Sequence, residues 1–203
     1  MTVLPDKPII YCISEGRALG HNLQEIKADI TAKIAKAADR GVHLFQIRER
    51  QISVAALFEL AREAVNAATG TGVQVLVNGR ADVALAVGAA GVHLPSDGLR
   101  PAELRNCVPS GFIIGVSTHS ADEVLTAREQ GADFAVFGPV FASPGKGIGV
   151  GLDLLRAAVP MAGPMPVLAL GGIDEVRSAE VLAAGASGWA AIRFLNELLE
   201  REN

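Results

Sequence analysis

The sequence has few cysteines, little positive charge and no long apolar run. Its 203 residues include 18 lysines and arginines against 22 acidic residues, and the formal charge of −4 argues against a nucleic-acid partner. Cys12 and Cys107 lack the spacing of a zinc site or a disulfide framework, so we expect two buried thiols without a role. No apolar run reaches the roughly 18 residues of a membrane span. We therefore expect neither nucleic acid nor a membrane as partner.

The first residues lack the basic start and long apolar stretch of a secretory signal, so we expect a cytoplasmic protein. Half of the residues are apolar and a fifth are charged, which is a globular balance. No linker or shift in composition divides the chain, and we expect a single domain over residues 1–203. The alanine-rich helices suit either solvent or a partner subunit, so a homo-oligomer stays open.

Short β-branched runs alternate with helical patterns along the chain. The runs that predict strands are Ile9–Ile13, Leu44–Ile47, Val73–Val77, Gly91–Leu94, Phe112–Val116, Phe134–Phe137, Val167–Leu170 and Gly188–Ile192. The patterns that predict helices are Ile26–Ala38, Val54–Ala67, Asp82–Ala89, Ala121–Gln130, Leu152–Val159 and Val176–Ala184. Most predicted strands therefore lead into a helix.

Strict alternation of strand and helix predicts parallel strands joined by right-handed crossovers. Eight such units in about 200 residues fit a (β/α)8 TIM barrel. The rival is an open dinucleotide-binding sheet, which usually carries Gly-x-Gly-x-x-Gly after its first strand. Residues 14–17 read Ser-Glu-Gly-Arg and lack that motif. The predicted fold class is α/β, with a (β/α)8 TIM barrel as the architecture.

Asn78-Gly79 follows the third predicted strand and has the sequence of a hairpin turn. In a hairpin a second alternating strand would come next, whereas residues 80–86 have a helical pattern. Asn78 is therefore predicted to end a barrel strand. Side chains at that end point into the mouth where barrel enzymes carry their active sites.

Other strand ends also carry polar side chains, among them Gln46 and Ser117. Arg48 and Arg50 lie two residues apart and point the same way if the strand continues through them. Their guanidinium groups suit a carboxylate or a phosphate. The alternative is that both arginines form structural ion pairs with nearby acids such as Glu49.

Gly171-Gly172 ends the seventh strand and opens a helix, which leaves backbone amides free to approach a phosphate. Ile192-Arg193 ends the eighth strand, and barrel phosphate sites commonly use the loops after strands seven and eight. We therefore predict a phosphate site there. The alternative for Gly171-Gly172 is a plain tight turn.

The segment 141–149 is the longest loop and carries Ser143 and Lys146 above the sixth strand. One interpretation is a lid over an anionic substrate. The other is a mobile loop with a solvated lysine.

His119 follows the fifth strand, and imidazole suits proton transfer near neutral pH. His93 ends the fourth strand, and either histidine is open to a purely structural role. His43 lies at the opposite face of the barrel and is predicted to be structural. A metal site is not predicted, because Asn78 is followed by glycine and the only nearby carboxylate is Asp97.

Six short motifs at successive strand ends together resemble the thiamine phosphate synthase superfamily, and they cover nearly the whole chain in order. They are Gln46–Arg50, Asn78–Arg80, Gly91–Asp97, Gly115–Ser120, Phe137–Phe141 and Gly171–Ile173. The superfamily fold is the (β/α)8 barrel, which agrees with the periodicity.

The superfamily includes a synthase, which joins a pyrimidine diphosphate to a thiazole phosphate with magnesium, and a metal-free thiazole tautomerase. The synthase pattern has carboxylates for magnesium after strands three and four. Those positions are Gly79 and Gly98 here, with Asp97 displaced by one residue, and Arg50 replaces a lysine. Arg-Glu-Arg, Asn-Gly-Arg and His-Leu-Pro-Ser resemble the tautomerase branch. The resemblance therefore implies a thiazole tautomerase that uses no cofactor.

That resemblance implies a small thiazole phosphate as the partner and His119 as the catalytic proton carrier. The substrate-binding residues that it implies are Gln46, Arg48, Arg50, Asn78, Ser117, Ser143 and Lys146, and the phosphate-binding residues are Gly171, Gly172, Ile192 and Arg193. One alternative is the synthase, with magnesium held by Asp97 and substrate phosphates. Another is a non-catalytic barrel that binds thiazole or thiamine phosphates.

Overall fold

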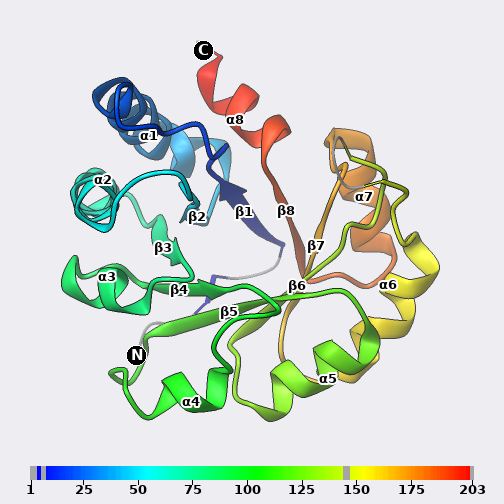
Figure 1. Cartoon of the computed structure of the whole chain (residues 1–203). Helices are drawn as coiled ribbons and strands as arrows, with labels where there is room; N and C mark the ends of the chain where they lie inside the picture. The colour runs from blue at the N-terminus through cyan, green and yellow to red at the C-terminus, as the bar shows by residue number, and fades with distance from the viewer. Residues whose placement is uncertain (1–3, 6–7, 144–146, 202–203) are drawn as a thin grey trace.

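The computed structural model describes residues 4–5, 8–143 and 147–201. Eight parallel strands form a closed barrel in the order β1 to β8, and β8 pairs back to β1. Helices form an outer ring around the strands (Figure 1). The predicted (β/α)8 barrel is confirmed, and the carboxyl ends of all strands consequently meet at one face.

Strands and helices alternate from β1 to α8, with two short 3₁₀ turns, η1 and η2. The elements are β1 Ile9–Ile13, α1 Leu23–Ala37, η1 Ala38–Arg40, β2 Leu44–Ile47, α2 Val54–Ala68, β3 Gln74–Asn78, α3 Ala81–Ala86, β4 Gly91–Leu94, α4 Pro101–Arg105, β5 Ile113–Thr118, α5 Ala121–Glu129, β6 Phe134–Phe137, α6 Leu152–Ala158, η2 Val159–Ala162, β7 Val167–Leu170, α7 Glu175–Ala183, β8 Gly188–Ala191 and α8 Arg193–Glu200.

The predicted strands agree closely with the observed ones, and five have identical bounds. The sequence analysis did not predict α4 or α8. Five residues are too few for α4 to show a helical period, and Pro101 at its first turn is the main signal. In α8, the apolar residues Phe194, Leu195, Leu198 and Leu199 stand at helical spacing, so this helix was recognisable.

The barrel interior is filled by side chains, because alternate residues of each strand point inward. On β1, Ile9, Tyr11 and Ile13 belong to the inner cluster, whereas Cys12 packs toward the helices. Phe134 of β6 packs edge-on against Tyr11, with ring centroids 5.6 Å apart. The inner cluster makes the barrel a packed core, so a ligand has room only at its mouth.

Gly115 makes room for this interior packing. A Cβ atom at Gly115 would lie 2.3 Å from the Phe134 ring, which is closer than atoms can approach. Alanine there would displace the ring from the barrel interior.

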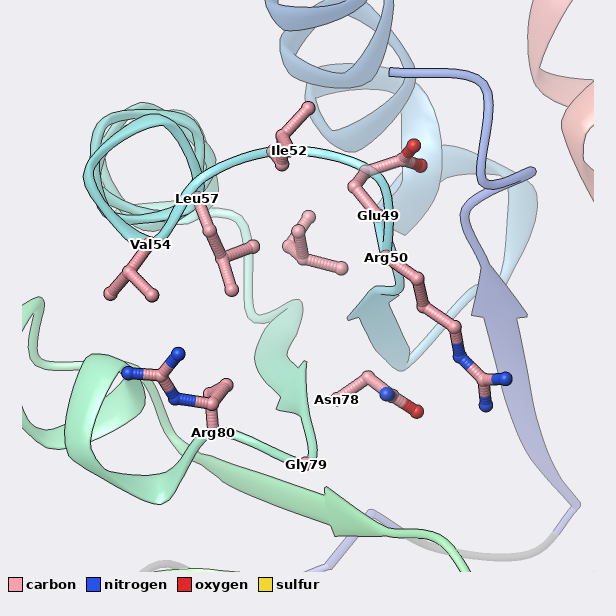
Figure 2. A pocket seen from close by; sticks show the side chains of 9 residues that line it. Glu49, Arg50, Ile52, Val54, Leu57, Asn78, Gly79 and Arg80 are labelled. Atoms are coloured by element: carbon pink, nitrogen blue, oxygen red, sulfur yellow. The ribbon is translucent and has the colours of Figure 1, made fainter. Parts of the chain in front are cut away.

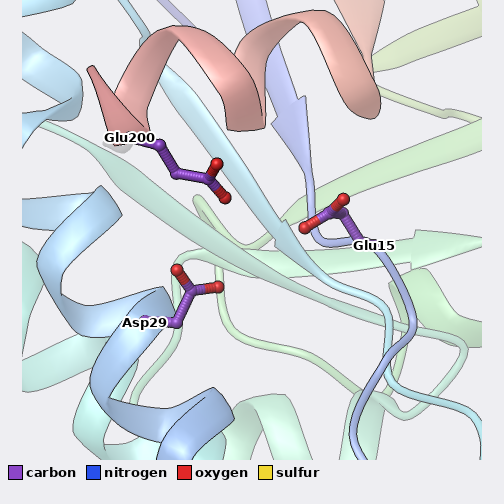
Figure 3. Close-up of side chains that lie close together, drawn as sticks. All are labelled: Glu15, Asp29 and Glu200. Carbon is purple, nitrogen blue, oxygen red and sulfur yellow. The ribbon is translucent and has the colours of Figure 1, made fainter.

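Lys33 of α1 forms ion pairs with acidic residues from the first and the last part of the described chain. Its Nζ lies 2.9 Å from Asp29 Oδ2, 2.8 Å from Glu200 Oε1 and 3.5 Å from Glu15 Oε2, and its side chain is only 2% exposed. Figure 3 shows these carboxylates converging from α1, α8 and the loop after β1. Carboxylate oxygens within 4.8 Å of one another are spaced for a cation, but the lysine ammonium already supplies the positive charge. We therefore interpret the cluster as an ion-pair network.

The expectation of two buried thiols is correct for Cys12 and wrong for Cys107. Cys12 is buried among apolar side chains, but Cys107 is exposed because it follows the short helix α4 at the surface. None of the helices in the described ranges is long and apolar enough to cross a membrane.

Candidate active site

A cavity of about 550 Å³ opens at the carboxyl ends of β5 to β8, and we call it the main cavity. Many of the predicted site residues line it. They are Ser117, His119, Ser143, Gly171, Gly172, Ile192 and Arg193. These residues are separated by up to 76 positions in the chain but share one space, because consecutive parallel strands end side by side.

One wall of the main cavity is built from the turn after β7. Gly171 and Gly172 have φ values of +105° and +63°, a left-handed region that favours glycine. A Cβ atom at Gly171 would lie 2.6 Å from Pro139 Cα, and one at Gly172 would lie 2.6 Å from the Ala142 carbonyl oxygen. The turn therefore needs glycine both for its backbone conformation and for its packing against the β6–α6 loop.

The first turn of α8 forms the neighbouring wall. Arg193 begins this helix, and Ile192 before it provides no side-chain hydrogen bond to cap it. The first amides of a helix point out of its end and favour an anion. The main cavity thus combines backbone amides with the Arg193 guanidinium beside the loops after β7 and β8, where the phosphate site was predicted.

His119 lies at the rim of the main cavity. Its Nδ1 is 2.5 Å from the Gly138 carbonyl oxygen, and its backbone amide donates to Glu123 Oε2 at 2.8 Å. A carbonyl oxygen only accepts, so Nδ1 must carry hydrogen in this contact. In the neutral ring Nε2 is then the unprotonated nitrogen, which is available as a base.

His93 lies inside the barrel at 3% exposure and is not among the residues that line the main cavity. Its Nε2 lies 2.9 Å from Ser117 Oγ, and its Nδ1 lies 3.3 Å from the Tyr11 hydroxyl. Gln46 Nε2 donates to that hydroxyl at 2.9 Å. Burial, with a smaller contribution from the positive Arg48, lowers the pKa of His93 to about 3. The ring is therefore neutral at physiological pH.

A second cavity of about 300 Å³ lies at the ends of β2 and β3, and we call it the β2–β3 pocket (Figure 2). Arg50 lines it from the loop after β2, and Asn78 lines it from the end of β3. Arg80 lies at the other side of the pocket and forms a two-point ion pair with Asp82, with one contact of 2.8 Å. Two predicted binding residues are therefore in this pocket rather than in the main cavity.

Glu49 does not pair with its arginine neighbours among the described ion pairs. Its carboxylate accepts from Ser14 Oγ at 2.7 Å, from the Gly16 amide at 3.0 Å and from the Ala18 amide at 2.7 Å. The local ion pairs considered from the sequence are thus not formed by this acid, because it binds the loop after β1 instead.

Burial, together with the neighbouring Arg50, lowers the pKa of Arg48.

The remaining predicted residues lie elsewhere. Of the described residues, Gln46 and Arg48 line neither cavity, and Gln46 is buried below the mouth. Lys146 lies outside the described ranges.

Sequence reasoning missed Arg177 of α7, which lines the main cavity. Its Nη1 donates to the Gly172 carbonyl oxygen at 2.8 Å, and its guanidinium carbon lies 4.9 Å from the centre of the Phe141 ring. The arginine thereby links the β7–α7 turn to the β6–α6 loop. The sequence signal was weak, because an arginine in a first helical turn faces either solvent or the barrel mouth.

The fold and the two cavities define a (β/α)8-barrel protein whose mouth is suited to small anionic ligands. The family model described as thiamine monophosphate synthase matches residues 13–195. The chain belongs to this family, and the superfamily resemblance is confirmed.

Individual relatives agree with this assignment. A Geobacter sulfurreducens protein is 44% identical over 167 residues, which are 81% of this chain and 78% of that protein. A thiamine-phosphate synthase of Methanoregula boonei is 41% identical over 191 residues, 90% of this chain and 83% of that protein. The structure of a thiamine phosphate pyrophosphorylase from Pyrococcus furiosus superposes with a TM-score of 0.78 at 27% identity, covering 95% of this chain and 92% of that one.

Proposed function

We propose that this chain is an enzyme of thiamine biosynthesis that binds a thiazole phosphate in the main cavity. The observation that supports it most is the convergence of the Gly171-Gly172 turn, the start of α8 and Arg193 on one cavity. Backbone amides and a guanidinium favour a phosphate, and the cavity is large enough for a small heterocycle beside it.

The first candidate reaction is the coupling of a pyrimidine diphosphate to the thiazole phosphate. It is supported by relatives that are 38–44% identical and whose names include thiamine-phosphate synthase. Two separate cavities at the same barrel face are consistent with two substrates. In this proposal Arg50 and Asn78 of the β2–β3 pocket hold the diphosphate, and the main cavity holds the thiazole.

Magnesium is implied for that coupling, but the donor residues fit it poorly. The two expected carboxylate positions are Gly79 and Gly98, and glycine offers no side-chain ligand. A Cβ atom at Gly98 would lie 2.9 Å from Pro95 Cγ, so the turn has no room for a larger residue unless it shifts. Asp97, one residue earlier, is exposed. The residues at the expected positions therefore do not form a magnesium site.

The second candidate is metal-free isomerisation of a thiazole carboxylate phosphate, and the glycines at the carboxylate positions favour it. A carbon-bound proton leaves one ring position and a proton is returned at the exocyclic carbon, so the ring becomes aromatic without oxidation or reduction. His119 Nε2 would carry the proton, since Nδ1 is held by the Gly138 carbonyl oxygen. Of the basic residues considered for the carboxylate, Arg50 lines the β2–β3 pocket at the same barrel face, whereas Arg48 lines neither cavity.

One set of assays separates these reactions. The purified protein is given both coupling substrates, with and without magnesium, and separately the non-aromatic thiazole isomer. Thiamine phosphate formed only with magnesium supports coupling, and an accelerated aromatisation supports isomerisation. Tight binding of a thiazole phosphate without any turnover indicates the non-catalytic alternative.

The phosphate site itself is tested by Arg193→Ala. We expect this variant to bind thiazole phosphate about tenfold more weakly, because a charge-assisted hydrogen bond is lost. Arg156→Ala is the matched control, because Arg156 is exposed on α6 and pairs with Asp153. Thiazole phosphate that does not bind to the unmodified protein at all would refute the proposed function.

A further inference from the structure

Inside the barrel, a chain of polar groups runs from Gln46 through Tyr11 and His93 to Ser117. The consecutive distances are 2.9, 3.3 and 2.9 Å. Gln46, Tyr11 and His93 are at most 3% exposed, whereas Ser117 lines the main cavity. These four hydrogen-bonded side chains therefore connect the packed interior of the barrel with the main cavity.

The direction of each hydrogen bond follows from the donors present. Gln46 donates its amide hydrogen to the Tyr11 oxygen. Tyr11 has one hydroxyl hydrogen, and the only other polar contact described for its oxygen is His93 Nδ1. The hydroxyl consequently donates to Nδ1, and a neutral imidazole then carries its own hydrogen on Nε2.

These hydrogen-bond directions require the imidazole of His93 to be neutral. Burial lowers its pKa to about 3, and Arg48 acts in the same direction. The rings of Tyr11 and Phe134 pack against it, with centroids 5.8 and 6.0 Å away, and exclude water from this part of the barrel. A neutral ring with its hydrogen on Nε2 donates to Ser117 Oγ.

We propose that the buried Gln46–Tyr11–His93 relay positions Ser117 so that its hydroxyl donates a hydrogen bond to the ligand. The Ser117 oxygen accepts from His93, so its own hydrogen is directed into the main cavity. The ligand atom that meets Ser117 is accordingly an acceptor, such as an unprotonated ring nitrogen or a carboxylate oxygen. A ligand with an N–H group at that place is disfavoured, because two donors would face each other.

In this relay Tyr11 and His93 are positioning residues, since neither lines the main cavity among its described residues. The identity of the ligand rests on the proposed function, but the direction of the relay does not. The two parts are therefore tested by separate measurements.

The relay is tested first in the ligand-free protein by nitrogen-15 NMR of its histidine side chains. We expect His93 to show a protonated Nε2 and an unprotonated Nδ1 near neutral pH. Tyr11→Phe keeps the ring packing but removes the hydroxyl, and we expect it to let the Nδ1–H tautomer appear. A protonated Nδ1 in the unmodified protein would overturn the proposal.

The positioning role is tested by binding of thiazole phosphate to Tyr11→Phe, Ser117→Ala and the double variant. We expect each single change to weaken binding about three- to tenfold, and the double variant to be no weaker than Ser117→Ala. Additive losses would contradict the relay, because they would mean that Tyr11 acts independently of Ser117.

Thr118→Val is the matched control for damage to β5. Its buried hydroxyl donates to the Val136 carbonyl oxygen at 3.2 Å, outside the relay, so we expect the tautomer of His93 to stay unchanged. Absence of binding in the unmodified protein would count against the proposed function only, since the tautomer is read without ligand.

Discussion

At the scale of single residues, two histidines on neighbouring strand ends have different environments. His119 is exposed at the cavity rim with one ring nitrogen held by a carbonyl oxygen. His93 is enclosed, and both of its ring nitrogens have partners. Only His119 therefore has a nitrogen available to a ligand, which is the property required of a general base.

His119→Gln tests this assignment. If isomerisation is the activity, we expect the rate to fall by roughly 10²–10⁴-fold, because that is the usual contribution of a positioned acid or base. Binding of the aromatic product should change by less than about threefold, since other residues hold the phosphate. His21→Gln, an exposed histidine before α1, serves as control in the same rate assay. An unchanged rate for His119→Gln would remove it from the mechanism.

The buried His93 predicts a pH dependence of stability. The unfolded chain binds a proton at His93 below about pH 6.5, whereas the folded protein does not until about pH 3. Because the unfolded state binds more protons in that window, stability falls as the pH falls through it. Between about pH 7 and pH 5.5, proton binding to His93 in the unfolded chain should lower the free energy of unfolding by roughly 1 kcal/mol.

Urea unfolding of the unmodified protein and of His93→Gln at both pH values measures this contribution. We expect the variant to lose less stability on acidification by about that amount. His43, whose pKa burial also lowers, is present in both proteins and cancels in the difference. Equal losses in the two proteins would show that His93 does not titrate as described.

At the scale of elements, the loop between β1 and α1 depends on a carboxylate from the end of β2. Glu49 accepts three hydrogen bonds from that loop and is 5% exposed. Figure 2 shows its carboxylate turned away from the Arg50 side chain. This arrangement fixes the loop beside the mouth, and Glu49 does not neutralise Arg50, which is among the residues that line the β2–β3 pocket.

Glu49→Gln should destabilise the protein by about 1–3 kcal/mol, because an amide cannot replace all the acceptor positions of a buried carboxylate. Chemical unfolding measures the change. Glu180→Gln, on the exposed side of α7, is expected to stay within about 0.5 kcal/mol of the unmodified protein. A Glu49→Gln variant as stable as that control would mean that the loop does not depend on the carboxylate.

Strands and most helices were predictable from the sequence, because their apolar periodicity is local. The residues at the strand ends were predictable as a group for the same reason. Their individual partners were not, since Glu49 binds a loop more than 30 positions away and Gln46 bonds to Tyr11 on the neighbouring strand, 35 positions earlier in the sequence. The two separate cavities depend on side-chain directions that a linear pattern does not contain.

At the scale of the whole molecule, the first and last strands close the barrel. β1 pairs with β8, α1 packs beside α8, and Asn196 donates to the Ile13 carbonyl oxygen at 2.8 Å (Figure 1). We call this junction of β1 and α1 with β8 and α8 the seam. Lys33 adds ion pairs to Glu15 on one side of the seam and to Glu200 on the other. The seam lies beside the main cavity, because Ile192 and Arg193 follow directly after β8.

Lys33→Met tests the contribution of the seam. The methionine keeps the packing but takes the Lys33 ammonium away from Glu200 and leaves Glu15 and Asp29 paired with Arg17 alone, so we expect a loss of roughly 1–3 kcal/mol. Glu200→Gln in the same protein should restore part of it by removing one negative charge. Lys36→Met, an exposed lysine of the same helix, is the control in the thermal unfolding measurement. No loss in Lys33→Met would show that the network is energetically neutral.

The pairing of β8 with β1 also sets an order of events during synthesis. As the nascent polypeptide leaves the ribosome, the edge of β1 has no hydrogen-bonding neighbour on that side until residues 188–191 have been translated. An unpaired strand edge is prone to association with other chains, so the half-made barrel is the form that most needs a chaperone.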